Sequence, residues 1–153
     1  MATIATQQPE AGRGPATPIG ETLDATVPRL CTALRGASSG TLAIPGMRWR
    51  VGELGAHIAQ TATVFTQAVT GEVTPYGERG EFSATVDQRL VDELKERDPG
   101  RLAALTEERY AVLRGALAGR PDDELLPRLQ GYSVAGLNAI WVIDLNVHGY
   151  QIG

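Results

Sequence analysis

Apolar residues recur at intervals of three and four along most of the chain, which is the period of an amphipathic α-helix. The first such pattern runs from about Gly20 to Gly36, and the second runs from Val51 to Gly71. A third covers residues 85–94 and a fourth covers 102–117. The last pattern follows Ser133, a residue type that favours a helix N-terminus, and continues almost to the final residue. Alternating strand patterns are short, so the chain is predicted to be all-α.

Several positions within these patterns carry further predictions. Leucines and a valine mark the core-facing stripe of the fourth helix: Leu102, Leu105, Val112, Leu113 and Leu117. Pro28 lies off the stripe of the first helix, where it would either kink the helix or mark its true start. Gly52 and Gly55 weaken the second helix, which indicates close approach by a neighbouring element. Thr85 and Gln88 have the spacing of a capping box for the third helix.

The segments between the patterns predict loops and an arm. Residues 1–19 are rich in Gln, Pro, Gly, Thr and Ala and have no period, so we expect a flexible N-terminal arm ahead of one domain, 20–153. Residues 72–82 form a long polar loop that could act as a lid. An accessory turn is expected near Pro121. Four main helices with such connections suit an antiparallel four-helix bundle.

Composition narrows the class of protein. The chain has 153 residues, 42% of them hydrophobic and 21% charged, which is enough to build one core without disulfides. Its net charge is −4 and its basic residues do not cluster, which argues against nucleic acid and membrane surfaces as partners. We expect a cytoplasmic protein, since the start of the chain does not resemble a signal peptide. Cys31 lies on an apolar stripe, which favours a buried hydrophobe over a nucleophile.

Two helices carry polar residues inside their apolar stripes. On the last helix, Asp144 and His148 interrupt the stripe and are four residues apart, so both side chains lie on one face. On the second helix, His57 points toward the core in the same way. If the two helices pack side by side, these residues form a set of two histidines and one carboxylate. Such a set is typical of a catalytic zinc with an open fourth position or of a non-haem iron site.

A second interpretation needs no metal. Asp144 and His148 could be a hydrogen-bonded pair, and His57 could be a core histidine with a satisfied partner. Glu53 precedes His57 by four residues and could be a ligand, a residue that orients a ligand, or an acid at the helix start. The last two roles are favoured. Trp49 and Trp141 are expected to be core or loop anchors.

Two segments resemble a known family. The segment Pro45–Ile58, with its Pro-Gly, Trp, Val, Leu and Ala-His residues, is similar to a signature of the N-terminal domain of mycothiol-dependent maleylpyruvate isomerases, in the DinB-like superfamily. The segment Asp144–Tyr150 resembles the family's acidic-x-x-x-His segment. The resemblance covers roughly residues 20–153. It implies a DinB-like four-helix bundle that binds a divalent metal, usually zinc, through His57, Asp144 and His148.

The chain departs from the family pattern at several positions. The family commonly has Glu where this chain has the shorter Asp144, which would pull a metal toward the last helix or weaken the site. Gln151 stands where an Asp often follows, and Arg50 replaces the usual Ser or Thr helix cap. The C-terminal domain of the full isomerases has no counterpart in this sequence.

The resemblance and the residues lead to one main hypothesis and two alternatives. The main hypothesis is a metal-dependent isomerase or S-transferase that acts on a small-molecule substrate with a thiol such as mycothiol as cosubstrate. Zinc is the expected ion, with nickel or iron as alternatives. The first alternative is a non-catalytic bundle that binds a small ligand or a partner protein around a structural or vestigial site. The second is metal-dependent hydrolysis. The sequence indicates no particular oligomeric state.

Overall fold

The computed structural model describes residues 18–129 and 131–153, so residues 1–17 of the predicted arm lie outside the described residues. Within these ranges the structure has isolated β-bridges but no strand, which agrees with the all-α prediction. The helices of the described ranges are α1 (Pro18–Gly36), α2 (Val51–Thr70), α3 (Ala84–Glu93), α4 (Pro99–Leu117) and α5 (Val134–Ile152). No helix among them is both long and apolar enough to span a membrane.

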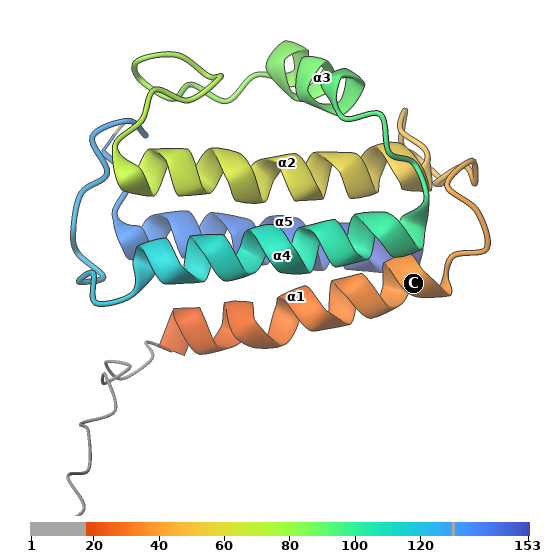
Figure 1. Cartoon of the computed structure of the whole chain (residues 1–153), viewed down its shortest axis with the longest axis horizontal. Coiled ribbons are helices and arrows are strands. Elements are labelled where there is room, and N and C mark those ends of the chain that lie inside the picture. The colour runs from red at the N-terminus through yellow and green to blue at the C-terminus, as the bar shows by residue number, and fades with distance from the viewer. Residues whose placement is uncertain (1–17, 130) are drawn as a thin grey trace, which may run out of the picture.

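Helices α1, α2, α4 and α5 form a four-helix bundle, and α3 lies outside it against α2 (Figure 1). The directions of the helices differ from a simple antiparallel bundle. Helices α1 and α5 run one way, and α2 and α4 run the other way (Figure 1). This arrangement arises because the connection from α2 to α4, residues 71–98, is long enough to carry the chain back to the end where α2 began.

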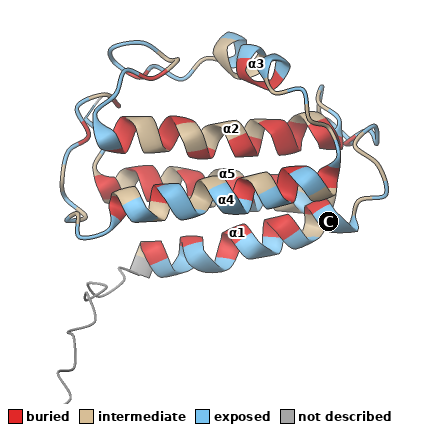
Figure 2. Ribbon diagram, viewed as in Figure 1, coloured by how far each residue is buried: buried red, intermediate tan, exposed pale blue. Residues whose placement is uncertain are grey.

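The buried faces of the four helices meet in one core (Figure 2). Its largest fully buried side chains include Leu23, Leu34, Leu54, Ile58, Leu113, Leu137, Trp141 and Leu145. The prediction for Val112 was wrong, because this side chain is 57% exposed. The buried face of α4 instead passes through Thr106, which is fully buried. A polar residue occupies that core position, so the apolar pattern alone did not mark it.

Helix α1 continues through Pro28, whose side chain is exposed. Pro28 therefore does not mark the start of the helix. At the other end of the bundle, Ser133 caps α5 as predicted, because its hydroxyl accepts a hydrogen bond from the Gly136 N–H at 3.1 Å. Helix α3, in contrast, begins after Ser83 rather than at Thr85, so the predicted capping box is not its N-cap.

The start of α2 packs closely against the loop that leads into α4. A Cβ atom on Gly52 would lie 2.7 Å from the carbonyl oxygen of Arg97, and one on Gly55 would lie 3.0 Å from the side chain of Leu102. The close approach predicted at these glycines is confirmed. Gly40 is tighter still, since its Cβ would lie 1.9 Å from the Arg97 oxygen. These contacts fix the N-terminal turn of α2, which leads directly to His57.

Candidate metal centre

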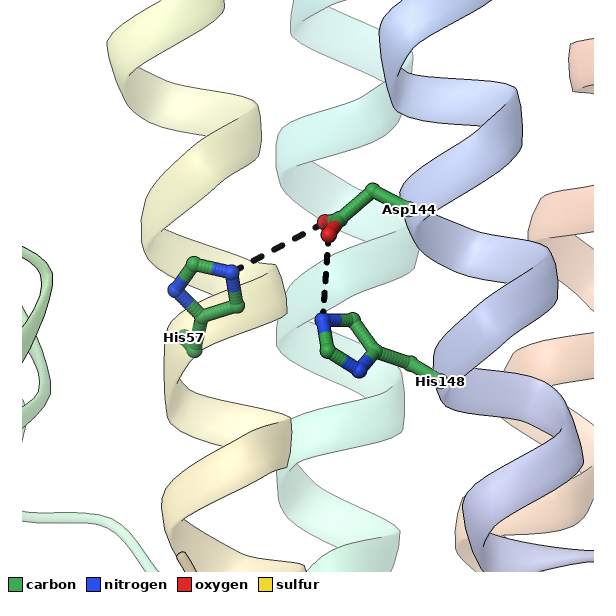
Figure 3. A group of neighbouring side chains, drawn as sticks. All are labelled: His57, Asp144 and His148. Carbon is green, nitrogen blue, oxygen red and sulfur yellow. Dashed lines mark ion pairs between the residues drawn. The ribbon is translucent and has the colours of Figure 1, made fainter. Parts of the chain in front are cut away.

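The three candidate ligands meet where α2 faces α5. His57 projects from α2, and Asp144 and His148 project from successive turns of α5 toward it (Figure 3). His148 is buried, and the side chains of His57 and Asp144 are 13% and 33% exposed. The condition set by the sequence, that the second and last helices pack side by side, is therefore met.

The Asp144 carboxylate lies between the two imidazoles. Its Oδ1 atom is 3.1 Å from Nε2 of His148, and its Oδ2 atom is 3.7 Å from Nε2 of His57. The two imidazole rings meet nearly edge to face, with centroids 5.6 Å apart. One ligand atom from each of the three residues lies within 4.8 Å of the others. Among the described residues, this is the group of acidic, histidine and cysteine side chains whose spacing suits one ion.

This spacing can be compared with the requirement of a tetrahedral ion. Zinc bonds to nitrogen and oxygen are about 2.1 Å long, which places two ligand atoms of one ion about 3.4 Å apart. Oδ1 of Asp144 is 3.1 Å from His148 and Oδ2 is 3.7 Å from His57, on either side of that value, so each carboxylate oxygen faces one histidine. The ligand atoms of the three residues lie within 4.8 Å of one another, so the set would contract slightly around one ion. The shorter Asp144 side chain therefore reaches both histidines from α5. Three protein ligands would leave a fourth position for water or a substrate.

The electrostatics of the site favour an anionic carboxylate. Burial by itself would raise the pKa of Asp144, but the adjoining His148 and His57 side chains outweigh it and hold that pKa well below its usual range. Burial likewise would lower the pKa of His148, yet its interaction with Asp144 raises it. Asp144 is consequently ionised at neutral pH, and the ionised carboxylate is the form that binds a cation.

Gln151 orients the second histidine. Its Oε1 atom is 2.8 Å from Nδ1 of His148, so the amide oxygen accepts a hydrogen bond when Nδ1 carries the proton. In that tautomer Nε2 of His148 carries a lone pair, which faces Asp144 and His57. Residues that accept from the outer nitrogen of a metal-binding histidine commonly fix its ring in this way. Gln151 thus fills, as a neutral acceptor, the position where the family pattern often has Asp.

Glu53 is engaged at the start of α2 rather than in the site. Its carboxylate accepts a hydrogen bond from the backbone N–H of Arg50 at 2.8 Å, which confirms the interpretation as an acid at the helix start. The Arg50 side chain donates to the carbonyl oxygen of Thr41 at 2.6 Å. The carbonyl oxygens of Gly40 and Leu42 accept from the first N–H groups of the helix. These backbone acceptors explain how α2 begins without a Ser or Thr cap.

Aromatic side chains that the sequence did not assign to the site lie beside it. The Trp49 ring is 4.9 Å from the His57 ring, and its indole N–H donates to Oε1 of Gln88 at 2.8 Å. Tyr76, from the 72–82 loop, donates to the Asp87 carboxylate. Burial, Asp87 and then the charge of Asp144 raise the pKa of Tyr76, so its phenol stays protonated at neutral pH. No spacing rule could have found these residues, because loops bring them to the site.

Cys31 and Trp141 belong to the core. Cys31 is fully buried, and burial raises its pKa to about 11, so the thiol is protonated at neutral pH and unsuited to act as a nucleophile. Trp141 packs edge to face on Phe65, with ring centroids 5.8 Å apart, as expected for an anchor between α5 and α2.

Comparisons with known proteins place the chain in a family. A search of curated proteins and a search of solved structures found no match for the chain. A family model described as the mycothiol maleylpyruvate isomerase N-terminal domain matches residues 20–153. The match spans both segments that carry the resemblance, and the helical bundle is the fold that the resemblance implied. The chain therefore belongs to the mycothiol maleylpyruvate isomerase N-terminal domain family.

Proposed function

We propose that this chain is a metal-dependent enzyme of the thiol-linked class, in which His57, Asp144 and His148 hold a divalent ion. The observation that carries the proposal is the approach of one ligand atom from each residue to within 4.8 Å of the others. Membership of a mycothiol-related family supports the thiol as cosubstrate. Zinc fits two imidazoles and one carboxylate, and nickel and iron are the alternatives.

When bound, the ion would supply a Lewis acid that keeps a low-molecular-weight thiol such as mycothiol deprotonated at neutral pH. The residues of the chain bind the ion and orient its ligands. Gln151 holds His148 with Nε2 toward the site, and Asp144 offsets the positive charge of the ion. Trp49 and Tyr76 stand beside the ligands, where they can exclude water from a small-molecule substrate.

The reaction class that suits these features is cis–trans isomerisation of a maleylpyruvate-like substrate, or transfer of the thiol to another electrophile. Hydrolysis is disfavoured by one observation. It needs a general base within reach of the bound water, and the candidate for that role, Glu53, is hydrogen-bonded to the Arg50 N–H at the helix start. A cytoplasmic location suits a thiol-dependent reaction, because that compartment is reducing.

Elemental analysis of untagged protein tests the metal site. We expect about one zinc, nickel or iron ion per chain in the parent protein. The His57→Ala and His148→Ala variants should lose the ion while keeping their helical circular dichroism, because each loses one of three ligands. Asp144→Asn should lose it too. The matched control is Asp24→Asn, whose carboxylate pairs with Arg114 on the other side of the bundle, and which should retain the ion.

Turnover tests the thiol chemistry. The loaded protein should isomerise maleylpyruvate, or transfer a thiol to an electrophile, only when mycothiol or a related thiol is present. An ion that is bound without thiol-dependent turnover would favour the non-catalytic bundle with a structural site. Absence of any ion after zinc or nickel is supplied would contradict the proposal and leave two histidines of the bundle as ordinary core residues.

A further inference from the structure

The two candidate histidine ligands are held in different ways. The ring of His148 is fixed by the hydrogen bond between its Nδ1 atom and Gln151. Among the described residues, the polar contact of the His57 ring is instead with Asp144, through the Nε2 atom that would bind an ion (Figure 3). The Cβ–Cγ torsion of a histidine is broad, so a ring without a partner on its outer nitrogen turns easily. The three ligand atoms stay together only if another contact holds the His57 ring.

The Trp49 ring makes that contact. Its centroid lies 4.9 Å from the centroid of the His57 ring, with the two planes at 40°, which is within the range of attractive aromatic pairs. Trp49 also packs against a cluster of buried side chains from α2, α3 and α4, namely Ala56, Val91 and Leu102. The indole is therefore supported by the core, and it limits how far the imidazole can turn.

Gln88 of α3 holds the Trp49 ring in turn. Its Oε1 atom accepts hydrogen bonds from the Trp49 indole N–H at 2.8 Å and from the Arg48 guanidinium at 2.9 Å. Its Nε2 atom donates to the carboxylate of Asp92 at 2.9 Å. These three bonds require the same orientation of the amide, with its oxygen toward the donors and its nitrogen toward the carboxylate. A chain of contacts therefore runs from α3 through the indole to the His57 ring.

We propose that Trp49, held in place by Gln88, is a positioning residue of the metal centre, and that its ring fixes the His57 imidazole with Nε2 toward the other two ligands. This inference rests on the proposed function, in which His57 binds a divalent ion. The two histidines are then oriented by different means, His148 by its hydrogen bond with Gln151 and His57 by an aromatic contact. Loss of a residue that orients a metal-binding histidine typically weakens metal binding about 10–100-fold. Gln88 acts on the site only through Trp49.

Zinc affinity, measured by competition with a chelator, tests the role of this pair. Gln88→Leu and Trp49→Phe each remove the hydrogen bond between the two side chains, and each should weaken zinc binding roughly tenfold. The double variant should bind zinc no more weakly than either single variant, because both substitutions remove the same bond. The visible spectrum of bound cobalt(II), which reports the geometry of the ligands, should change in the same variants.

The matched control is Gln60→Leu. Gln60 is a second half-buried glutamine, and it links α2 to α3 because its Nε2 atom donates to the carbonyl oxygen of Leu90 at 2.9 Å. Its Oε1 atom accepts from Arg109 at 2.7 Å. Gln60→Leu should lower the free energy of unfolding much as Gln88→Leu does, yet leave the zinc affinity and the cobalt spectrum unchanged. Equal weakening of zinc binding in both glutamine variants, or no weakening in either, would overturn the proposal.

NMR of the metal-free protein follows the His57 ring itself and separates this inference from the proposed function. The ring current of Trp49 displaces the imidazole proton signals of His57, and Gln88→Leu should move these signals toward the positions of free histidine. The chain has two histidines, so His148→Ala identifies the signals of His57. Signals that stay in place in Gln88→Leu would overturn the positioning role. A parent protein that binds no ion would instead contradict the proposed function, whatever the ring signals show.

Discussion

Thr106 is a fully buried threonine of α4 whose hydroxyl has no hydrogen-bond partner among the described residues. A buried hydroxyl without a partner costs about 1–3 kcal/mol relative to its hydrated state. Thr26 on α1 provides a contrast, because it is also buried but its hydroxyl donates to the carbonyl oxygen of Thr22 at 2.7 Å. The two threonines therefore differ in hydrogen bonding rather than in burial.

Replacing Thr106 with valine should stabilise the protein. Valine keeps the branched shape, so Thr106→Val removes the unpaired hydroxyl without leaving a cavity. We expect the free energy of unfolding in urea to rise by about 1 kcal/mol at an unchanged m-value. Thr26→Val should be neutral or destabilising, because it removes a hydrogen bond that is made. Equal effects of the two substitutions would show that the Thr106 hydroxyl is satisfied in solution.

The candidate ligands could be predicted from the sequence, but their surroundings could not. His57, Asp144 and His148 are polar residues within apolar helical stripes, and helical periodicity places them on inward faces before any fold is known. Trp49 and Tyr76 lie in loops, where no period fixes the direction of a side chain. Their positions beside the ligands follow from tertiary contacts such as the hydrogen bonds to Gln88 and Asp87.

At the scale of the element, the start of α2 depends on two glycines, which have no side chain and so allow close backbone packing. Gly40 and Gly52 lie so close to the carbonyl oxygen of Arg97 that a Cβ atom on either would overlap it. The side chain of Arg97 continues from this contact and donates to the carbonyl oxygen of Val91 near the end of α3 at 2.9 Å. One arginine thus joins the starts of α2 and α4 to the end of α3.

Two glycine-to-alanine substitutions should have opposite effects. Gly52→Ala should lower the free energy of unfolding by about 1–3 kcal/mol, because the new methyl group would push against backbone at 2.7 Å. Gly115→Ala, in the last turn of α4, should raise it by about 0.4–1 kcal/mol, because nothing lies within 4 Å of the new atom and alanine restricts the unfolded chain more than glycine does. Thermal unfolding of both variants measures this. A destabilised Gly115→Ala would contradict the explanation based on space.

The periodicity of apolar residues predicted the helices, but it did not predict the directions in which they run. The stripes predicted five helical segments close to the observed α1 to α5. A stripe states which face of a helix is buried and does not state which neighbour buries it. The parallel course of α2 and α4 depends on how the connection 71–98 crosses the bundle, and the outward position of Val112 depends on the neighbours of α4.

At the scale of the whole molecule, the bundle is packed unevenly. Helix α2 packs extensively on α4, and α1 packs extensively on α5, whereas α2 and α5 have fewer contacts with each other. The three candidate ligands lie in this last interface, with His57 on one side and Asp144 and His148 on the other (Figure 3). A bound ion would therefore join α2 and α5, which pack less extensively than the other neighbouring pairs of bundle helices.

Zinc should accordingly stabilise the whole fold. An ion that binds the folded state alone, at a free concentration one hundred times its Kd, adds about 2.7 kcal/mol, which corresponds to a rise in Tm of about 5–10 °C for a domain of this size. Calorimetry with and without zinc measures the shift. His57→Ala and His148→Ala should each abolish the shift, because each variant removes one of the three ligands. Asp24→Asn, whose carboxylate lies outside the site, should retain it. A shift that survives in both histidine variants would place the ion elsewhere on the molecule, and a shift lost only in His148→Ala would mean that α5 binds the ion without joining α2 to it.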